Sequence, residues 1–317
     1  MNSRKVPVLS LKKYISGSKE EKNKFCKDLF NGFKDYGFVV IEDHTVSESL
    51  IQKSYELSKA FFSLSDVSKE QYKIPGAFGQ RGYISYRSET AKGFSVADLK
   101  EFWHIGRQAK SSQLKKLRYL PNVWPSEVPG FKETFLEIYS ELEKTGNLLL
   151  EALTYSLEIE KDYFSKSHEM GNSILRLLHY PPVPDFVEPG ATRASAHQDI
   201  DTLSLLLASK GGGLQLLEKE GTWLPIEADP GRIICNCGDM LDRITGSVLK
   251  STTHRVVIPM EDEFRKASRY SMPFFLHGRG DWKLEKLPKF KDKGEDIPVI
   301  TADDYLQERL KELGLKK

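Results

Sequence analysis

The sequence has little of three features that would each indicate a class of protein: cysteine, an excess of one charge, and long apolar runs. Its 317 residues include only three cysteines, Cys26, Cys235 and Cys237, which give neither a disulfide framework nor a zinc knuckle. The 47 basic and 45 acidic side chains nearly cancel, to a formal net charge of +2, which does not favour nucleic acid or a membrane surface as a partner. No apolar stretch is long enough for a signal peptide or a membrane span. We therefore expect a cytoplasmic protein, and the sequence gives no indication of its oligomeric state.

The first half of the sequence predicts helices separated by short strands. Ser18 is placed to cap a helix that ends at Gly37, and the segment FVVIED then reads as a strand. A second helix is expected over 47–62, and an irregular loop region rich in Gly, Ser and Tyr over 72–98. The clearest helix is Phe131–Leu157, whose apolar residues follow the 3.6-residue period of one helix face.

The second half changes to short apolar or alternating segments punctuated by Gly, Pro and Asp. These segments are SILRLLHY, TLSLLLA, GLQLL, TWLPI, RIICNC, STTHRVVI and RYSMPFFL. Such spacing indicates an antiparallel sandwich or jelly roll. We expect a single domain, with a mostly helical region over 1–170, a jelly-roll catalytic core over 171–300 and a C-terminal helix over 301–317. Thr301 and Asp304 form the capping pattern of that last helix.

A candidate metal site begins in the segment SAHQDIDTLSLLL. In a strand, positions two apart point to the same face, so His197 and Asp199 can present a nitrogen and an oxygen to one point. His254 opens another apolar strand and supplies a second imidazole. Two histidines and a carboxylate form the facial triad of non-haem Fe(II) oxygenases, although zinc hydrolases use the same set. Asp201 is the less favoured carboxylate.

A second pattern bears on the choice between an Fe(II) oxygenase and a zinc hydrolase. Arg269 and Ser271 fall on one face of a predicted strand, and a guanidinium beside a hydroxyl suits a carboxylate ligand. A zinc hydrolase has no general need for this pair. An Fe(II) enzyme with a dicarboxylic co-substrate does, because one end of the co-substrate chelates the metal and the other needs a fixed cation.

With these residues in place, the chain resembles the isopenicillin N synthase-like family of 2-oxoglutarate- and Fe(II)-dependent dioxygenases. The resemblance lies in HQDIDTLSLLL, GGLQLL, the segment from GTWLPI to STTHRVVIP, and RYSMPFFL, and in the first half in VPVLSL, DYGFVVIEDHTV and LHYPP. It implies a mainly β fold with flanking helices: a double-stranded β-helix (jelly-roll) core braced by N-terminal helices and one long helix.

The resemblance also implies roles for individual residues. Iron would be bound by His197, Asp199 and His254. The co-substrate 2-oxoglutarate would be bound by Arg269, Ser271 and Tyr180. Many relatives carry Asn two positions before this tyrosine, where the present chain has Leu178.

The implied reaction uses Fe(II), 2-oxoglutarate and O2 to oxidise a small-molecule substrate by hydroxylation, desaturation or ring closure, with release of succinate and CO2. Candidate substrate contacts are Arg81, Tyr83, Tyr86, Arg87, Phe102, His104 and Phe275. An inward-pointing Arg81 or Arg87 would favour an anionic substrate.

Three alternatives stay open at this point. An iron oxidase of the same fold would not consume 2-oxoglutarate, and some members of the family keep the Arg-x-Ser pair without oxidising it. A zinc hydrolase would leave Arg269 without a purpose. A non-catalytic jelly-roll binding module would keep the histidines only as structural residues.

Overall fold

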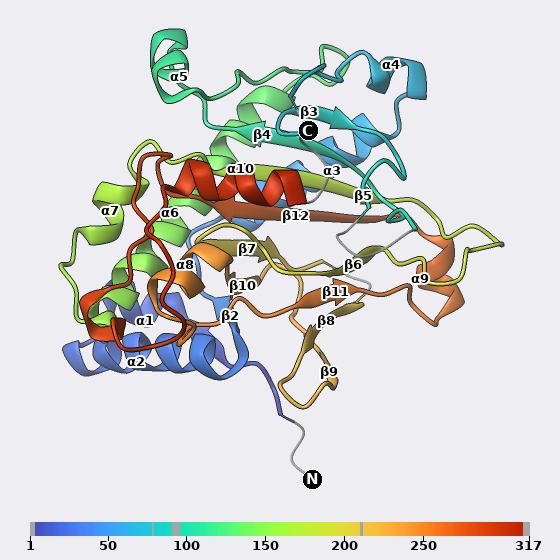
Figure 1. Cartoon of the computed structure of the whole chain (residues 1–317). Coiled ribbons are helices and arrows are strands. Elements are labelled where there is room, and N and C mark those ends of the chain that lie inside the picture. The colour runs from blue at the N-terminus through green and yellow to red at the C-terminus, as the bar shows by residue number, and fades with distance from the viewer. Residues whose placement is uncertain (1–3, 78, 91–95, 210–211, 313–317) are drawn as a thin grey trace.

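Two β-sheets form the centre of the protein in a computed structural model that describes residues 4–77, 79–90, 96–209 and 212–312 (Figure 1). The larger sheet has eight strands and the smaller has four. In spatial order, the larger sheet consists of β1 (Val8–Ser10), β2 (Phe38–Glu42), β10 (Ile233–Cys237), β7 (Leu203–Leu207), β12 (Arg269–Leu276), β5 (Ile174–Tyr180), β4 (Glu101–Gly106) and β3 (Gly82–Ile84). The smaller sheet consists of β6 (Ala194–His197), β11 (His254–Val256), β8 (Leu214–Leu217) and β9 (Trp223–Pro225).

The strand connections define a jelly roll. From β5 to β8 successive strands alternate between the larger and the smaller sheet, and so do β9 to β12. All strand pairs are antiparallel except β1 with β2. The predicted fold class, mainly β with flanking helices around a double-stranded β-helix, is confirmed.

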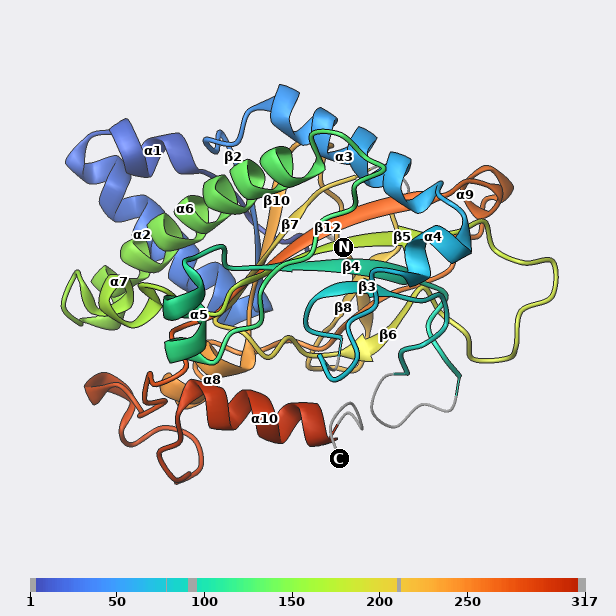
Figure 2. The same cartoon turned by 90° about the horizontal axis from the view of Figure 1, so that it is seen from above.

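Helices cover the larger sheet and close one end of the molecule. They are α1 (Leu11–Ser16), α2 (Lys19–Tyr36), α3 (Glu48–Phe62), α4 (Asp66–Glu70), α5 (Ser111–Leu117), α6 (Phe131–Leu157), α7 (Tyr163–His168), α8 (Asp239–Ile244), α9 (Asp262–Lys266), the 3-10 helix η1 (Pro288–Phe290) and α10 (Ala302–Glu312). In Figure 2, α3 and α6 lie on one side of the larger sheet and α10 on the other. The predicted capping box of α2 is present, with Ser18 and Glu21 bonding reciprocally, and Gly37 ends this helix at φ 72°.

The long helix α6 lies directly on the larger sheet, at the bounds predicted for it. Gly146 makes the close approach possible, because a Cβ at this position would lie 2.8 Å from Cδ2 of Leu276 on β12. The apolar stripe of α6 therefore packs against the sheet, as the predicted brace requires.

The first half of the chain is less exclusively helical than the sequence indicates. It supplies β1 to β4 of the larger sheet, and β3 lies inside the region expected to be an irregular loop over 72–98. Within that range, residues 78 and 91–95 are outside the described residues, as is the end of the predicted C-terminal helix beyond 312. That the chain forms one domain with the boundaries given above stays a prediction.

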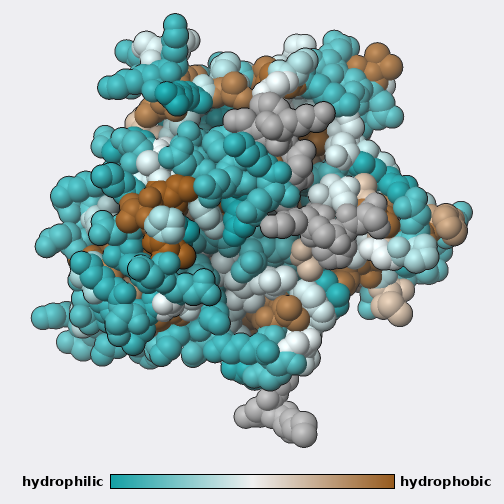
Figure 3. Space-filling view, viewed as in Figure 1, coloured by the Kyte–Doolittle hydropathy of each residue, from teal (hydrophilic) through white to brown (hydrophobic). Residues whose placement is uncertain are grey.

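The visible surface is mostly hydrophilic, with scattered apolar patches (Figure 3). No described helix is long and apolar enough to cross a lipid bilayer.

Candidate metal centre and active-site cavity

The two histidines of the sequence motif are direct neighbours across the smaller sheet. His197 at the end of β6 pairs with His254 at the start of β11 in the antiparallel register. Their ring centroids are 4.4 Å apart. Two imidazoles that are far apart in the sequence therefore meet because of one strand pairing.

Asp199 completes a three-residue cluster. Its Oδ1 lies 3.7 Å from Nε2 of His197, and its Oδ2 lies 3.7 Å from Nε2 of His254. One ligand atom from each of the three residues lies within 4.8 Å of the others. Atoms bound about 2.0–2.2 Å from one metal at right angles lie about 3 Å apart, so small inward shifts would close this cluster on an ion. Asp199 lies two residues beyond the end of β6, so the strand argument for its position was wrong, although the residue does reach the histidines.

Backbone carbonyls fix the orientation of the two imidazoles. Nδ1 of His197 lies 2.7 Å from the Ser195 carbonyl oxygen, and Nδ1 of His254 lies 3.1 Å from that of Thr252. Donation from Nδ1–H to a carbonyl leaves the lone pair of Nε2 free for a metal. Burial, followed by the nearby His254, lowers the pKa of His197 to about 4, so its imidazole is neutral at pH 7.

Asp199 is held by donors on its far side. Oδ2 accepts hydrogen bonds from the Ser204 hydroxyl at 2.6 Å and from Nδ2 of Asn236 at 2.9 Å. Burial raises the pKa of this carboxyl, but the two imidazoles and these hydrogen bonds outweigh burial and lower it. The carboxylate therefore stays ionised and fixed in direction.

Asn236 is a contact that sequence reasoning missed. It lies on β10 between Cys235 and Cys237, which are fully buried as expected. Alternation along the strand puts Asn236 on the opposite face, and that face points to Asp199. A polar side chain inside the otherwise apolar segment RIICNC was the available signal.

Asp201, the less favoured carboxylate of the motif, also lines the cavity and bonds neighbouring groups. Its Oδ2 lies 2.8 Å from the Ser204 hydroxyl, and its backbone oxygen accepts from the Met240 N–H at 3.0 Å. Burial and the neighbouring Asp199 raise the pKa of Asp201 well above its usual value. It is not part of the three-residue cluster.

A cavity of about 560 Å³ opens beside the cluster. Its lining includes His197 and Asp199, and α10 contributes Leu306 and Leu310. The His197 side chain is 39% exposed, against 9% for His254. Because His197 has its accessible surface on this cavity, a molecule bound there would lie next to the metal position.

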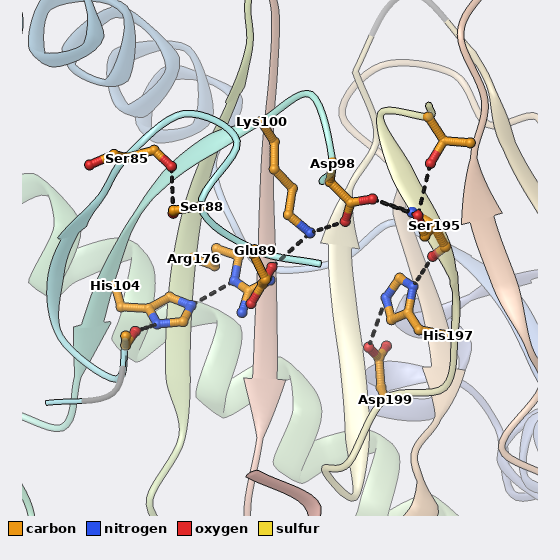
Figure 4. Close-up of polar contacts among 12 residues, drawn as sticks. Ser85, Ser88, Glu89, Asp98, Lys100, His104, Arg176, Ser195, His197 and Asp199 are labelled. Carbon is orange, nitrogen blue, oxygen red and sulfur yellow. Dashed lines mark hydrogen bonds and ion pairs between the residues drawn. The ribbon is translucent and has the colours of Figure 1, made fainter. Parts of the chain in front are cut away.

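One wall of the cavity is a chain of charged side chains (Figure 4). The Lys100 ammonium lies 2.7 Å from Asp98 and 2.8 Å from Glu89. Oδ1 of Asp98 accepts from both the backbone N–H and the hydroxyl of Ser195 on β6, at 2.9 and 2.7 Å. The wall is thereby joined to the strand that carries His197.

Arg176 continues this wall at the end away from the metal cluster. Its Nε donates to Nε2 of His104 at 2.6 Å, while Nδ1 of His104 lies 2.5 Å from the Gly79 carbonyl oxygen (Figure 4). Burial and Arg176 lower the pKa of His104 well below its usual value, so this neutral ring can accept from the guanidinium. The guanidinium carbon lies 4.3 and 5.2 Å from the ring centroids of Phe102 and Phe275. Arg176 is thus held rigidly at the cavity surface.

The structure places most, but not all, of the predicted substrate contacts on the cavity. Those that line it are Arg81, Tyr83, Phe102, His104 and Phe275. The lining does not include Tyr86 or Arg87, and Arg87 instead pairs with Glu188 at 3.0 Å. The Lys, Arg, Asp and Glu side chains of the cavity that sequence reasoning missed are Lys73, Glu89, Asp98, Lys100 and Arg176.

Arg81 is inward-pointing, but its donors are already used. It is 2% exposed, and it donates to the carbonyl oxygens of Leu120 and Gln80 at 3.2 and 2.6 Å. The Tyr83 hydroxyl similarly bonds Glu101. These two residues build the cavity wall more than they offer free groups to a ligand.

The predicted co-substrate residues form a buried cluster in the larger sheet. Arg269 on β12 pairs in register with Tyr180 on β5, and Ser271 pairs with Leu178. Arg269 is 9% exposed, and its guanidinium carbon lies 5.2 Å from the Tyr180 ring centroid. These residues are not part of the lining of the cavity. Burial lowers the pKa of the cavity residue Lys100, but Glu89 and then Asp98 outweigh burial and raise it, and Tyr180 adds a smaller contribution in the same direction.

Comparison with known proteins identifies the family. Residues 6–127 match the model of the "non-haem dioxygenase in morphine synthesis N-terminal" family, and residues 171–278 match that of the 2OG-Fe(II) oxygenase superfamily. A curated "2-oxoglutarate-Fe(II) type oxidoreductase" of Aspergillus fumigatus is 30% identical, over 96% of this chain and 92% of the relative.

Solved structures agree with this assignment. A 2OG-Fe(II) oxygenase family protein of Caulobacter crescentus is 41% identical, with a TM-score of 0.87, over 98% of this chain and 100% of its own. A Neurospora crassa protein, solved in complex with alpha-KG and thymine, is 26% identical, with a TM-score of 0.87, over 96% of both chains. The chain therefore belongs to the 2OG-Fe(II) oxygenase superfamily and is an Fe(II)- and 2-oxoglutarate-dependent dioxygenase.

Proposed function

We propose that His197, Asp199 and His254 bind the Fe(II) ion of this dioxygenase. The donor set fits, because two imidazoles and one ionised carboxylate meet with their ligand atoms within 4.8 Å of one another. Three protein ligands on one side leave adjacent positions for the co-substrate and O2. When bound, the ion supplies the activation of O2 and the oxidation that is coupled to conversion of 2-oxoglutarate into succinate and CO2.

We further propose that Arg269, with Ser271 and Tyr180, binds the distal carboxylate of 2-oxoglutarate. Nε and Nη1 of Arg269 are buried and have no hydrogen-bond partner among the described residues. A buried charged donor without a partner is costly, and the oxygens of a carboxylate would supply the missing acceptors. This observation, together with the three-residue metal cluster, carries the assignment.

The substrate is proposed to occupy the cavity between the metal and Arg176. The related Neurospora crassa protein has been solved with thymine and with 5-formyluracil, which supports a small molecule with carbonyl groups. Nε of Arg176 is bonded to His104 and Nη1 pairs with Glu89 at 3.8 Å, so Nη2 is the nitrogen that we propose donates to such a carbonyl. Arg81, Tyr83, His104 and Phe275 would shape the cavity. For Tyr86 and Arg87, a contact with substrate remains a prediction from the sequence only.

We propose that the partner of this enzyme is a small molecule rather than nucleic acid or a membrane, and that its location is cytoplasmic. Apolar side chains such as Leu306 and Leu310 would exclude water from the bound substrate.

The metal assignment is tested by adding Fe(II) and 2-oxoglutarate to the apoprotein without oxygen and following the visible charge-transfer band of the chelate. The wild-type protein should form the band, and His197→Ala should lose it. His44→Ala is a matched control, because His44 is not part of the metal cluster and bonds a distant carbonyl oxygen, that of Gly231. A band of unchanged intensity in His197→Ala would exclude that residue as a ligand.

An assay of succinate formation in air distinguishes a 2-oxoglutarate-dependent dioxygenase from an iron oxidase of the same fold. A 2-oxoglutarate-dependent dioxygenase forms one succinate for each substrate oxidised, whereas an oxidase of the same fold forms product without succinate. Product formation in the complete absence of 2-oxoglutarate would contradict the proposed reaction.

A further inference from the structure

Arg193 is a buried cation to which neither the sequence motifs nor the metal cluster give a role. It lies directly before β6 and is only 1% exposed. Its guanidinium carbon is 5.9 Å from the ring centroid of Tyr180, the same ring that lies 5.2 Å from the guanidinium carbon of Arg269. The two arginines thus share one aromatic neighbour, although Arg193 precedes a strand of the smaller sheet and Arg269 lies on a strand of the larger one.

Both arginines have unused hydrogen-bond donors. Arg193 donates from Nη2 to the Phe264 carbonyl oxygen at 2.9 Å, but its Nε is buried without a partner among the described residues. Nε and Nη1 of Arg269 are also buried without a hydrogen-bond partner among the described residues. Buried donors are almost always paired in folded proteins. Three unpaired donor nitrogens on two arginines that share one aromatic neighbour therefore indicate a ligand that accepts hydrogen bonds.

The charges point to the same kind of ligand. In the described part of the chain, neither arginine has an Asp or Glu within ion-pair distance, whereas the nearby Lys100 has two. Burial and then the proximity of Arg269 lower the pKa of Arg193 to about 10. Two like charges in a buried place repel each other, and an anion between them would remove both the repulsion and the unpaired donors.

We propose that Arg193 is a second arginine of the co-substrate site and binds, together with Arg269, the distal carboxylate of 2-oxoglutarate. The inference rests on the proposed function of Arg269. Planar guanidinium groups match the geometry of a carboxylate, and two of them can engage both of its oxygens. Because Arg193 precedes β6 and His197 ends it, one short strand then carries a group for each end of the co-substrate.

A purely structural role for Arg193 makes a different prediction. The bond to the Phe264 carbonyl fixes the chain near α9 and uses only one of the five guanidinium N–H groups. If that bond were its whole role, replacing Arg193 would perturb every ligand of the metal site to the same extent. A carboxylate-binding role affects only ligands that have the distal carboxylate.

The experiment compares two keto acids that chelate iron in the same way. 2-Oxoglutarate has a distal carboxylate, and 2-oxopentanoate ends in a methyl group at the same carbon. Each is titrated anaerobically into the full-length protein with Fe(II), and the dissociation constant is read from the charge-transfer band. The variants are Arg193→Met, which keeps an apolar stem, Arg193→Lys, which keeps the charge, and Arg269→Met. Arg265→Met is the control, because Arg265 is a neighbouring arginine that is not buried.

We expect the wild type and Arg265→Met to prefer 2-oxoglutarate strongly. Arg193→Met should lower this preference about tenfold or more, as the loss of a charged hydrogen bond does, with 2-oxopentanoate affinity nearly unchanged. Arg193→Lys should fall between the two. Equal loss of affinity for both acids, or an unchanged preference in Arg193→Met and Arg193→Lys, would overturn the inference while leaving the role of Arg269 intact. A wild type without preference for 2-oxoglutarate would instead overturn the proposed function itself, and the inference with it. Should Arg193→Met not fold, Arg193→Lys alone decides between these outcomes.

Discussion

The two side chains that hold Asp199 offer a direct test of how the metal site is built. Asn236 and Ser204 donate to the same oxygen, Oδ2, at 2.9 and 2.6 Å. Asn236→Leu removes one donor and keeps the approximate volume, and Ser204→Ala removes the other. Neither variant alters a residue proposed to bind the metal.

The size of the effect follows from the number and kind of bonds lost. One hydrogen bond to an ionised group contributes about 1.5–3 kcal/mol. Loss of a group that orients a metal ligand lowers metal affinity about 10–100-fold, or about 1.4–2.7 kcal/mol, so the two estimates agree. Ser204→Ala should have the larger effect on folding stability, because its hydroxyl also lies 2.8 Å from Asp201. Asn236→Leu should therefore be the cleaner test of metal affinity.

The assay is anaerobic competition for Fe(II) between the protein and a chromogenic chelator, combined with thermal melting of the apoprotein. Ser58→Ala is the matched control, because Ser58 is equally buried and its hydroxyl has no partner among the described residues. We expect Ser58→Ala to bind Fe(II) as the wild type does. If Asn236→Leu also bound Fe(II) with wild-type affinity, then Asp199 would not depend on these donors, and our account of its orientation would be wrong.

Two further predictions concern stability. In Gly106→Ala, the new Cβ would lie 1.9 Å from Cζ of Arg81. We therefore expect the free energy of unfolding, measured by urea denaturation, to fall by about 1–3 kcal/mol. The loss should be smaller in an Arg81→Met background, and an equal loss there would contradict the proposed clash. Burial lowers the pKa of His168 to about 3, so on acidification below about pH 6.5 the unfolded chain takes up a proton that the folded chain does not, and stability falls as the pH decreases toward 3. Between pH 7 and pH 5 this group should cost about 2 kcal/mol. The cost should disappear in His168→Asn, and an equal pH dependence in that variant would show that other groups cause it.

The sequence is sufficient for the parts of the site that depend on local pattern. His197 ends one strand, His254 begins another, and Arg269 and Ser271 lie two residues apart on a third, as the structure shows. The extent of the long helix could also be predicted, because apolar residues recur at helical spacing along most of its length. These features need only the periods of helix and strand.

Residues that depend on which strands are neighbours could not be predicted in the same way. Asn236 reaches Asp199 because β10 lies beside β7 in the larger sheet. Arg176 lies next to His104 because β5 pairs with β4, a strand that the sequence did not indicate. Both are set by the order and register of strands, which single-sequence periodicity does not contain.

Arg193 shows the same limit in another form. An arginine before a strand is ordinarily a surface residue, and only its burial beside Tyr180 reveals it as a candidate anion contact.

The two proposed ligand sets share one structural principle, because each rests on a cross-strand pair. His197 faces His254 in the smaller sheet, and Tyr180 faces Arg269 in the larger one. A pairing shift of one residue in either sheet would turn one member of a pair to the opposite face. The pairing of β6 with β11 shifts in register between His254 and Val256. The pairing of the two histidines therefore does not simply follow from the register of the rest of these strands. The distance between the metal and the arginines, which a bound molecule must span, therefore depends on the strand register in both sheets. For this reason, the spacing of ligand residues along the chain does not by itself define the site.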